Sequence, residues 1–223
     1  MKKNRMLKAA LGLGAAMSIW LGLSAYGAQS SVIESVNVSF KTVYGEPEEI
    51  PEPEVTVSGK SCSLGDVQYR TDYDSWKPGR KVRVEVTVVA EDGKYFPATL
   101  NRSKCKVTGA DFVSAKALDD SSLQVKADYR PVTVLGDTQK AGWSSTSKKK
   151  AVWKSVEYAP GYTLTLYGDN KVVKRITVES NSVNLADYMT DMDKTYYYEV
   201  KAVPVTSDEK KYLKEGQYVT STD

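Results

Sequence analysis

The sequence predicts an all-β protein: two antiparallel β-sandwich domains that follow an N-terminal signal segment. Short runs of alternating apolar and polar residues recur from residue 32 onward, separated by residues that form turns. The first domain contains no convincing apolar period of 3.6, so nothing there indicates an amphipathic helix. The 223 residues suffice for one large or two small domains, and a hydrophobic content of 41% can fill a core.

Residues 1–27 have the pattern of a bacterial-style secretory signal. A basic head at residues 1–8 precedes an apolar run at 9–23, and small residues follow at Ala25 and Gly27. We expect cleavage after Gly27, with cleavage after Ser30 as a second option. An uncleaved anchor is the alternative, since the run approaches the ~18–20 residues that span a bilayer. No cysteine lies at the exit, which excludes a lipoprotein anchor.

Charge and composition argue against several classes of function. The net charge is +3, but four of the 31 basic residues lie in the signal segment, so cleavage leaves 27 basic and 28 acidic side chains. A chain near neutrality has no general attraction for nucleic acid, and we expect membrane contact only through the signal segment. The chain has no histidine, the commonest general base and transition-metal ligand. We therefore predict no enzyme, no cofactor and no metal site.

The first domain is predicted to cover residues 31–137 and to contain about eight strands. An acidic, proline-rich run at 45–54 should form a solvated, extended connection, because proline cannot donate to a strand ladder. The clearest strand has valines at every second position from Val82 to Val88, and Asp92-Gly93 then suggests a tight turn. The expected strands lie near residues 36–40, 55–57, 65–70, 82–88, 95–96, 105–107, 112–117 and 123–129.

The second domain is predicted to cover residues 138–223. Small and polar residues dominate 134–150, which indicates a solvated junction ending in a run of three lysines. A turn is expected at 168–171, strands near 176–178 and 183–185, and an irregular turn at 187–193. In the run from Tyr196 to Val203, Tyr196, Tyr198 and Val200 share an apolar side, so this run should be a half-buried strand.

Three segments of the second domain resemble the B, C and F strands of a fibronectin type III domain. They are Trp153 with its neighbours, Tyr162-x-Leu-x-Leu-Tyr167, and Tyr196-x-Tyr-x-Val-x-Ala202. The resemblance implies core roles for Trp153, Tyr162 and Tyr196, and a tyrosine corner in which the Tyr196 hydroxyl contacts the preceding backbone. The chain also resembles the front part of secreted Gram-positive surface proteins that carry cell-wall-binding repeats. It has no such repeat itself, so wall attachment is not implied.

Two cysteines and two tryptophans are further candidates. Cys62 and Cys105 are predicted to form a disulfide because the chain is exported, and reduced thiols packed as small hydrophobes are the alternative. Trp76 and Trp143 are candidates for glycan contact if their rings are exposed, although aromatic residues in sandwiches usually lie in the core.

Four aspartates are the candidates for a catalytic carboxylate pair. Asp72, Asp74, Asp119 and Asp120 all lie in polar, turn-like sequence, where solvated carboxylates are the rule.

These observations favour an exported, non-enzymatic surface protein that acts as an adhesion, interaction or spacer module, at the cell surface or secreted. Possible partners are cell-wall glycan or a surface protein. The alternative is a carbohydrate- or cell-wall-binding protein that uses exposed aromatic residues. A carboxylate-dependent glycosidase is a third, weaker hypothesis. A flat, closed surface favours the first, a coplanar aromatic row the second, and a cleft with facing carboxylates the third.

Overall fold

The structure, a computed structural model, describes residues 31–71 and 74–222. The predicted signal segment, residues 1–27, lies outside this part of the chain. The all-β prediction is confirmed: the described residues form strands and a single short 3₁₀ turn, η1 (Glu209–Lys211). None of the described residues belongs to a helix that is long and apolar enough to cross a membrane.

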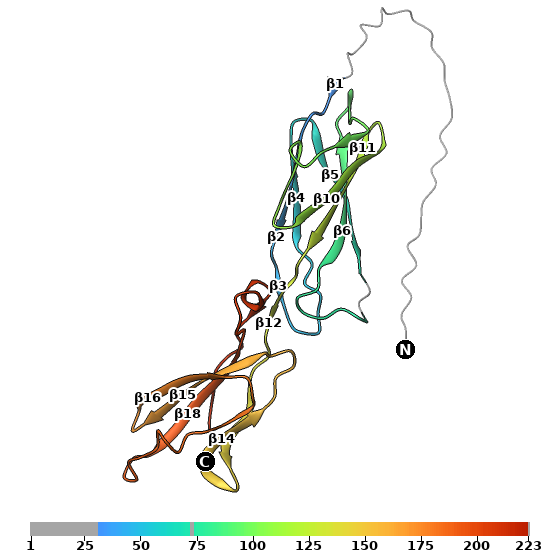
Figure 1. Ribbon diagram of the computed structural model, residues 1–223. Coiled ribbons are helices and arrows are strands. Elements are labelled where there is room, and N and C mark those ends of the chain that lie inside the picture. The colour runs from blue at the N-terminus through green and yellow to red at the C-terminus, as the bar shows by residue number, and fades with distance from the viewer. Residues whose placement is uncertain (1–30, 72–73, 223) are drawn as a thin grey trace, which may run out of the picture.

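The N-terminal half, defined by the core residues between Ile33 and Tyr129, contains two main sheets that share one core. Two short strands, β1 (Ser31–Val32) and β7 (Lys94–Tyr95), pair separately. The five-stranded sheet has the order β5 (Cys62–Arg70), β6 (Val82–Ala90), β11 (Ser122–Tyr129), β10 (Asp111–Asp119) and β8 (Thr99–Leu100). The three-stranded sheet has the order β4 (Glu54–Ser58), β2 (Val36–Lys41) and β9 (Cys105–Thr108) (Figure 1).

The alternating sequence of β6 produces the predicted burial. Val82, Val84, Val86 and Val88 are each at most 1% exposed, whereas the residues between them are partly exposed. β11 pairs with β6 in a continuous antiparallel register and buries Leu123, Val125 and Ala127 in the same core. Such burial of alternate side chains is what fixes the register, since a shift by one residue would expose every valine.

The prediction of purely antiparallel sheets is wrong. β2 pairs in parallel with β9, and β1 pairs in parallel with β7. Asp92-Gly93 does form a turn, with Lys94 N–H donating to the Glu91 carbonyl at 3.0 Å, but β7 then pairs with β1 and not back onto β6. Alternation reports which face of a strand is buried, and it contains no information about the direction of a distant partner.

The C-terminal half, defined by the core residues between Leu135 and Leu213, also contains two sheets around one core. One has the order β13 (Gln139–Ser144), β14 (Ser147–Lys154) and β17 (Ser182–Asn184). The other has the order β16 (Lys171–Val178), β15 (Gly161–Gly168), β18 (Tyr196–Val203) and β20 (Val219–Thr220). Leu164, Leu166, Tyr198 and Val200 are fully buried between them.

The predicted solvated junction at 134–150 is corrected by the structure. Residues 139–144 form β13, and the lysine run lies within β14, where Lys149 Nζ donates to the Met189 carbonyl at 3.1 Å. The side chains of β13 and β14 are largely polar on their exposed face, which is why composition alone suggested a linker.

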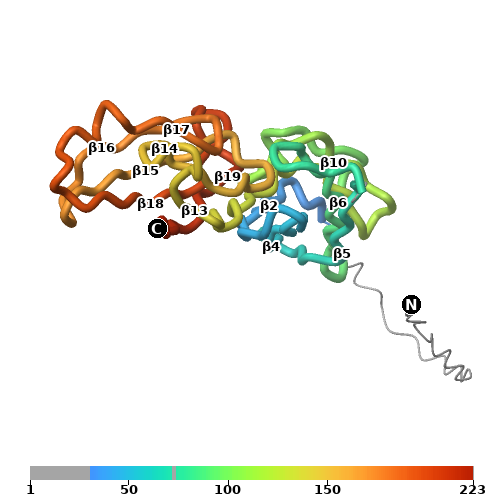
Figure 2. Tube along the Cα trace, turned by 90° about the horizontal axis from the view of Figure 1, so that it is seen from below, coloured from blue at the N-terminus to red at the C-terminus, as the bar shows by residue number. Residues whose placement is uncertain are grey.

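The two halves are joined end to end through a small sheet (Figures 1 and 2). Its central strand is β12 (Val132–Val134), which pairs in parallel with β3 (Tyr44–Gly45) and with β19 (Leu213–Lys214). β3 belongs to the N-terminal half and β19 follows η1 in the C-terminal half, so both halves hydrogen-bond to the strand that links them.

Candidate functional site

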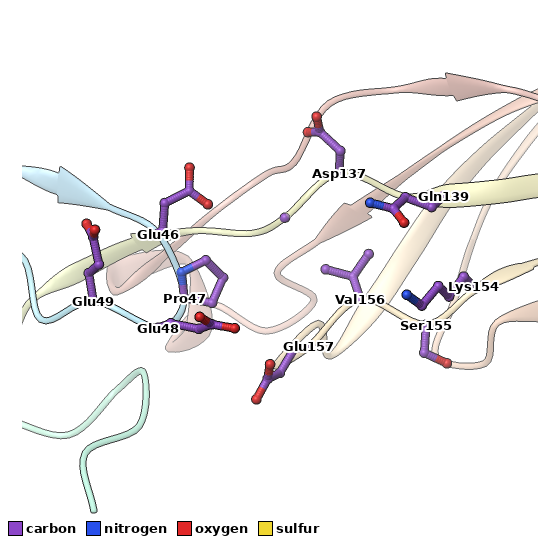
Figure 3. Close-up of a pocket in the computed structure, with 11 residues that line it drawn as sticks. Glu46, Pro47, Glu48, Glu49, Asp137, Gln139, Lys154, Ser155, Val156 and Glu157 are labelled. Carbon is purple, nitrogen blue, oxygen red and sulfur yellow. The ribbon is translucent and has the colours of Figure 1, made fainter. Parts of the chain in front are cut away.

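A groove of about 740 Å³ lies beside the junction and is lined by both halves (Figure 3). The loop after β3 contributes Glu46, Pro47, Glu48 and Glu49, and the C-terminal half contributes the other wall. That wall comprises Gly136, Asp137, Gln139, Lys154, Ser155, Val156 and Glu157. Three glutamates of the acidic, proline-rich run therefore line a groove that the other half of the molecule also lines.

Negative charge dominates the groove. Glutamates from the loop after β3 line the groove together with Asp137 and Glu157, and Lys154 is the one amine among the lining residues. The Asp137 carboxylate accepts a hydrogen bond from the Gln217 N–H at 3.2 Å, so it is held by the chain that returns toward β20. The described residues contain no cluster of three or more acidic, cysteine or histidine side chains arranged to hold a metal ion.

The structure does not bring the candidate carboxylates together. Asp72 lies outside the described residues, and Asp74 lies in the β5–β6 loop, at the end of the five-stranded sheet where Val82 pairs with Tyr129. Asp119 and Asp120 lie at the opposite end, where Ser122 pairs with Val89. Seven residue steps along β6 separate these ends by roughly 23 Å, which is more than twice the spacing of a glycosidase pair.

The two aspartates at the β10–β11 turn have structural contacts. Asp119 Oδ1 accepts hydrogen bonds from the Ser121 N–H and Oγ, both at 2.8 Å, and these bonds lower the pKa of the carboxyl. The main-chain oxygen of Asp120 accepts a bond from the Phe96 N–H at 3.0 Å. An ionised carboxylate that caps its own turn has the role expected of a turn residue.

The predicted Cys62–Cys105 disulfide is not formed, because both cysteines are free thiols. They are buried in the same core, Cys62 at the start of β5 and Cys105 at the start of β9. Burial raises the pKa of the Cys105 thiol to about 11 and also raises that of Cys62, with a smaller contribution from Glu91. This arrangement agrees with the alternative prediction, in which the two reduced thiols pack as small hydrophobic side chains.

Neither candidate tryptophan offers an exposed ring. Trp76 is only 8% exposed and packs in the first core, where its ring N–H donates to the Arg80 carbonyl at 3.2 Å. Trp143 is half-buried and makes an edge-to-face contact with Tyr198, with ring centroids 5.2 Å apart. The expectation that these rings could be glycan platforms is therefore wrong for Trp76, and Trp143 is occupied in packing.

The predicted core residues of the second domain do lie in or against its core. Trp153 and Tyr162 are each 3% exposed and pack edge to face, with ring centroids 5.3 Å apart. Tyr196 is half-buried, and its hydroxyl accepts a bond from the Asp191 N–H at 3.3 Å. This is the predicted contact with the preceding backbone, across the irregular turn before β18.

Tyrosines on the outer face of the four-stranded sheet pack against other side chains of this protein. Tyr167 and Tyr197 stack with their centroids 4.8 Å apart and an interplanar angle of 8°. The Lys201 ammonium lies 4.5 Å from the centre of the Tyr218 ring. Rings that stack on one another or lie against an ammonium group do not form a row of coplanar, accessible rings, which is what a polysaccharide chain requires.

The comparisons with known protein families and with curated proteins find no match to this chain.

Proposed function

We propose that the chain is an exported, non-enzymatic surface protein whose two β-sandwich domains, residues 31–137 and 138–223, act as a rigid spacer or interaction module. The observation that carries this proposal is the end-to-end arrangement of two separate cores, joined by the hydrogen-bonded sheet β19-β12-β3. Such a connection extends the molecule along one direction and places its two ends far apart (Figure 1).

Strand order supports a fibronectin type III-like second domain. The strands that resemble B, C and F are β14, β15 and β18, and β14 lies in one sheet while β15 and β18 are neighbours in the other. The contact of the Tyr196 hydroxyl with the Asp191 N–H supports the tyrosine corner. Sandwich domains of this kind commonly serve at cell surfaces, and the signal-like residues 1–27 agree with export.

Binding without turnover is the expected biochemical behaviour. Asp74 lies at the opposite end of the five-stranded sheet from Asp119 and Asp120, and the chain contains no histidine. Carbohydrate binding, the alternative, lacks the exposed rings of Trp76 and Trp143 on which it was based. The spacer or interaction role therefore has the better support.

The test is expression of the full chain in a Gram-positive host, followed by cell fractionation and intact-mass analysis. We expect a secreted or surface-bound product whose N-terminus lies between residues 28 and 31. The purified product should release nothing from peptidoglycan, glycans or peptides. Full-length protein confined to the membrane would contradict export, and hydrolysis lost in Asp74→Asn or Asp119→Asn would establish an enzyme. Saturable glycan binding without hydrolysis would support the alternative.

A further inference from the structure

We infer that residues 205–216 form a strap that locks the two halves of the protein at one fixed angle. This segment connects β18 to β20, and its strand β19 lies along the strand that links the halves. The inference deepens the proposed spacer role and rests on it for its biological purpose, because a spacer of defined reach requires a junction that does not bend.

Main-chain hydrogen bonds attach the strap to the link. The Thr133 N–H donates to the Tyr212 carbonyl at 2.9 Å, and the Leu135 N–H donates to the Lys214 carbonyl at 3.0 Å. On its other edge β12 pairs with β3, with Val132 opposite Tyr44. The link is therefore the middle strand of a sheet, and the halves cannot rotate about it without breaking backbone hydrogen bonds.

Side chains of the strap also contact the N-terminal half. The Arg130 guanidinium lies 5.6 Å from the centre of the Tyr212 ring, and it forms an ion pair with Asp208 at 3.5 Å. Gly79 also lies directly against that ring: a Cβ added at Gly79 would be 2.9 Å from two Tyr212 ring carbons. Its φ of +93° also favours glycine. Glycine at position 79 therefore suits both the backbone conformation and the space beside the ring.

The strap also contacts the C-terminal half. Leu213 is 3% exposed within the second core, and the Gly216 N–H donates to the Ala202 carbonyl at 3.0 Å. At its beginning, Val205 lies against Gly161 of β15, where an added Cβ would be 2.5 Å from a Val205 methyl carbon. A segment anchored at both ends to one half and paired to the link between them acts as a brace, whereas a plain linker would act as a hinge.

The angle is tested by spin-label distance measurements on the full mature chain with Lys106→Cys and Lys171→Cys. These exposed positions lie on β9 and β16, one in each half. Cys62 and Cys105 are buried, so the chain without added cysteines should take up no label in the folded state and is the labelling control.

The expected result is one narrow distance distribution for the parent chain. Tyr212→Ala should make it at least about twice as wide, because the junction then loses the ring packing against Gly79 and Arg130. Tyr218→Ala is the matched control, since Tyr218 is 43% exposed and its ring lies against Lys201 of β18, and it should leave the width unchanged.

A broad distribution in the parent chain would overturn the inference, as would an unchanged width in folded Tyr212→Ala. Near-ultraviolet circular dichroism reports whether each variant folds. If Tyr212→Ala does not fold, the width of the distance distribution is measured in Arg130→Gln, where it should also increase. This substitution removes the ion pair and the cation–π contact and leaves the backbone pairing intact. Failure of export or surface display would reject the spacer role without changing these distances, so the two proposals fail separately.

Discussion

At the scale of single residues, Tyr198 is the anchor of the second core. It is fully buried, and its hydroxyl lies within hydrogen-bond distance of two carbonyl oxygens, 2.6 Å from that of Gly142 and 2.7 Å from that of Val152. The ring therefore joins β18 to both β13 and β14 across the core. A residue that connects both sheets contributes through its hydroxyl as well as through its buried area.

Tyr198→Phe should lower the free energy of unfolding by about 1–3 kcal/mol, because it leaves buried carbonyl oxygens without their donor. Tyr197→Phe is the matched control, since its hydroxyl bonds only to the exposed Asn170 at 3.3 Å, and it should change stability by less than about 0.5 kcal/mol. Urea denaturation measures both. Equal effects of the two substitutions would contradict the anchoring role.

The same tyrosine should make stability depend on alkaline pH. Burial raises the pKa of Tyr198 to about 12, above the ordinary tyrosine value of 10.0, so the unfolded chain loses this proton first as pH rises. Its contribution is complete below pH 10, falls between 10 and 12, and is absent above that range. Urea midpoints from pH 8.5 to 11.5 should decline more steeply in the parent chain than in Tyr198→Phe. Parallel curves would refute this.

The thiols provide a third test at this scale. Both cysteines are free and buried, and burial raises the pKa of Cys105 to about 11. The folded protein should therefore react very slowly with a thiol reagent at pH 8, and the unfolded, unreduced protein should show two reactive thiols. Absence of titratable thiols after unfolding would restore the disulfide that was expected from export.

At the scale of elements, the β15–β16 hairpin illustrates how two turn residues set a register. Asp169 and Asn170 have φ values of 49° and 63°, the left-handed conformation that a two-residue hairpin loop requires. The Asp169 carboxylate also accepts a bond from the Thr195 N–H at 3.0 Å, which ties this turn to the start of β18. The turn therefore aligns three strands of the four-stranded sheet.

Asn170→Gly should leave the unfolding free energy within about 0.5 kcal/mol of the parent, because glycine accepts positive φ without strain. Asn170→Val should cost about 1–2 kcal/mol at the same position, because a β-branched residue is disfavoured in the left-handed region. Thermal and urea unfolding distinguish the two. A tolerated valine would mean that the turn does not hold this conformation in solution.

At the scale of the whole molecule, the two cores are separate, and the second core extends across the proposed domain boundary to Leu135. Leu135 is 2% exposed in the second core, and β12 pairs with β19 of the C-terminal half. A boundary between residues 137 and 138 would therefore remove a buried leucine and one strand of the junction sheet from the second domain.

A fragment of residues 131–223 should be more stable than one of residues 138–223 by about 2–4 kcal/mol, the usual cost of losing a large buried aliphatic side chain. Leu135→Ala in the longer fragment should reproduce most of the difference. Urea denaturation of the three proteins measures it. Equal stability of the two fragments would show that the link contributes nothing to the second core.

The sequence by itself determined the fold class and most strands. Alternation in residues 82–88 and in 196–202 predicted which side chains are buried, because a strand places successive residues on opposite faces. The turn at 168–171 and the core roles of Trp153 and Tyr162 also followed from local pattern and family resemblance. These features depend on neighbouring residues, which the sequence displays directly.

Only the tertiary structure decided the junction, the groove and the state of the cysteines. The contact of Tyr212 with Gly79 joins residues far apart in the chain, and the parallel pairing of β12 with β19 leaves no local signal in either strand. Glu46, Glu48 and Glu49 are exposed, as a solvated connection predicts, and only the tertiary structure places them beside the second half. Long-range contacts depend on how two packed halves meet, and residue pattern along one strand does not encode that geometry.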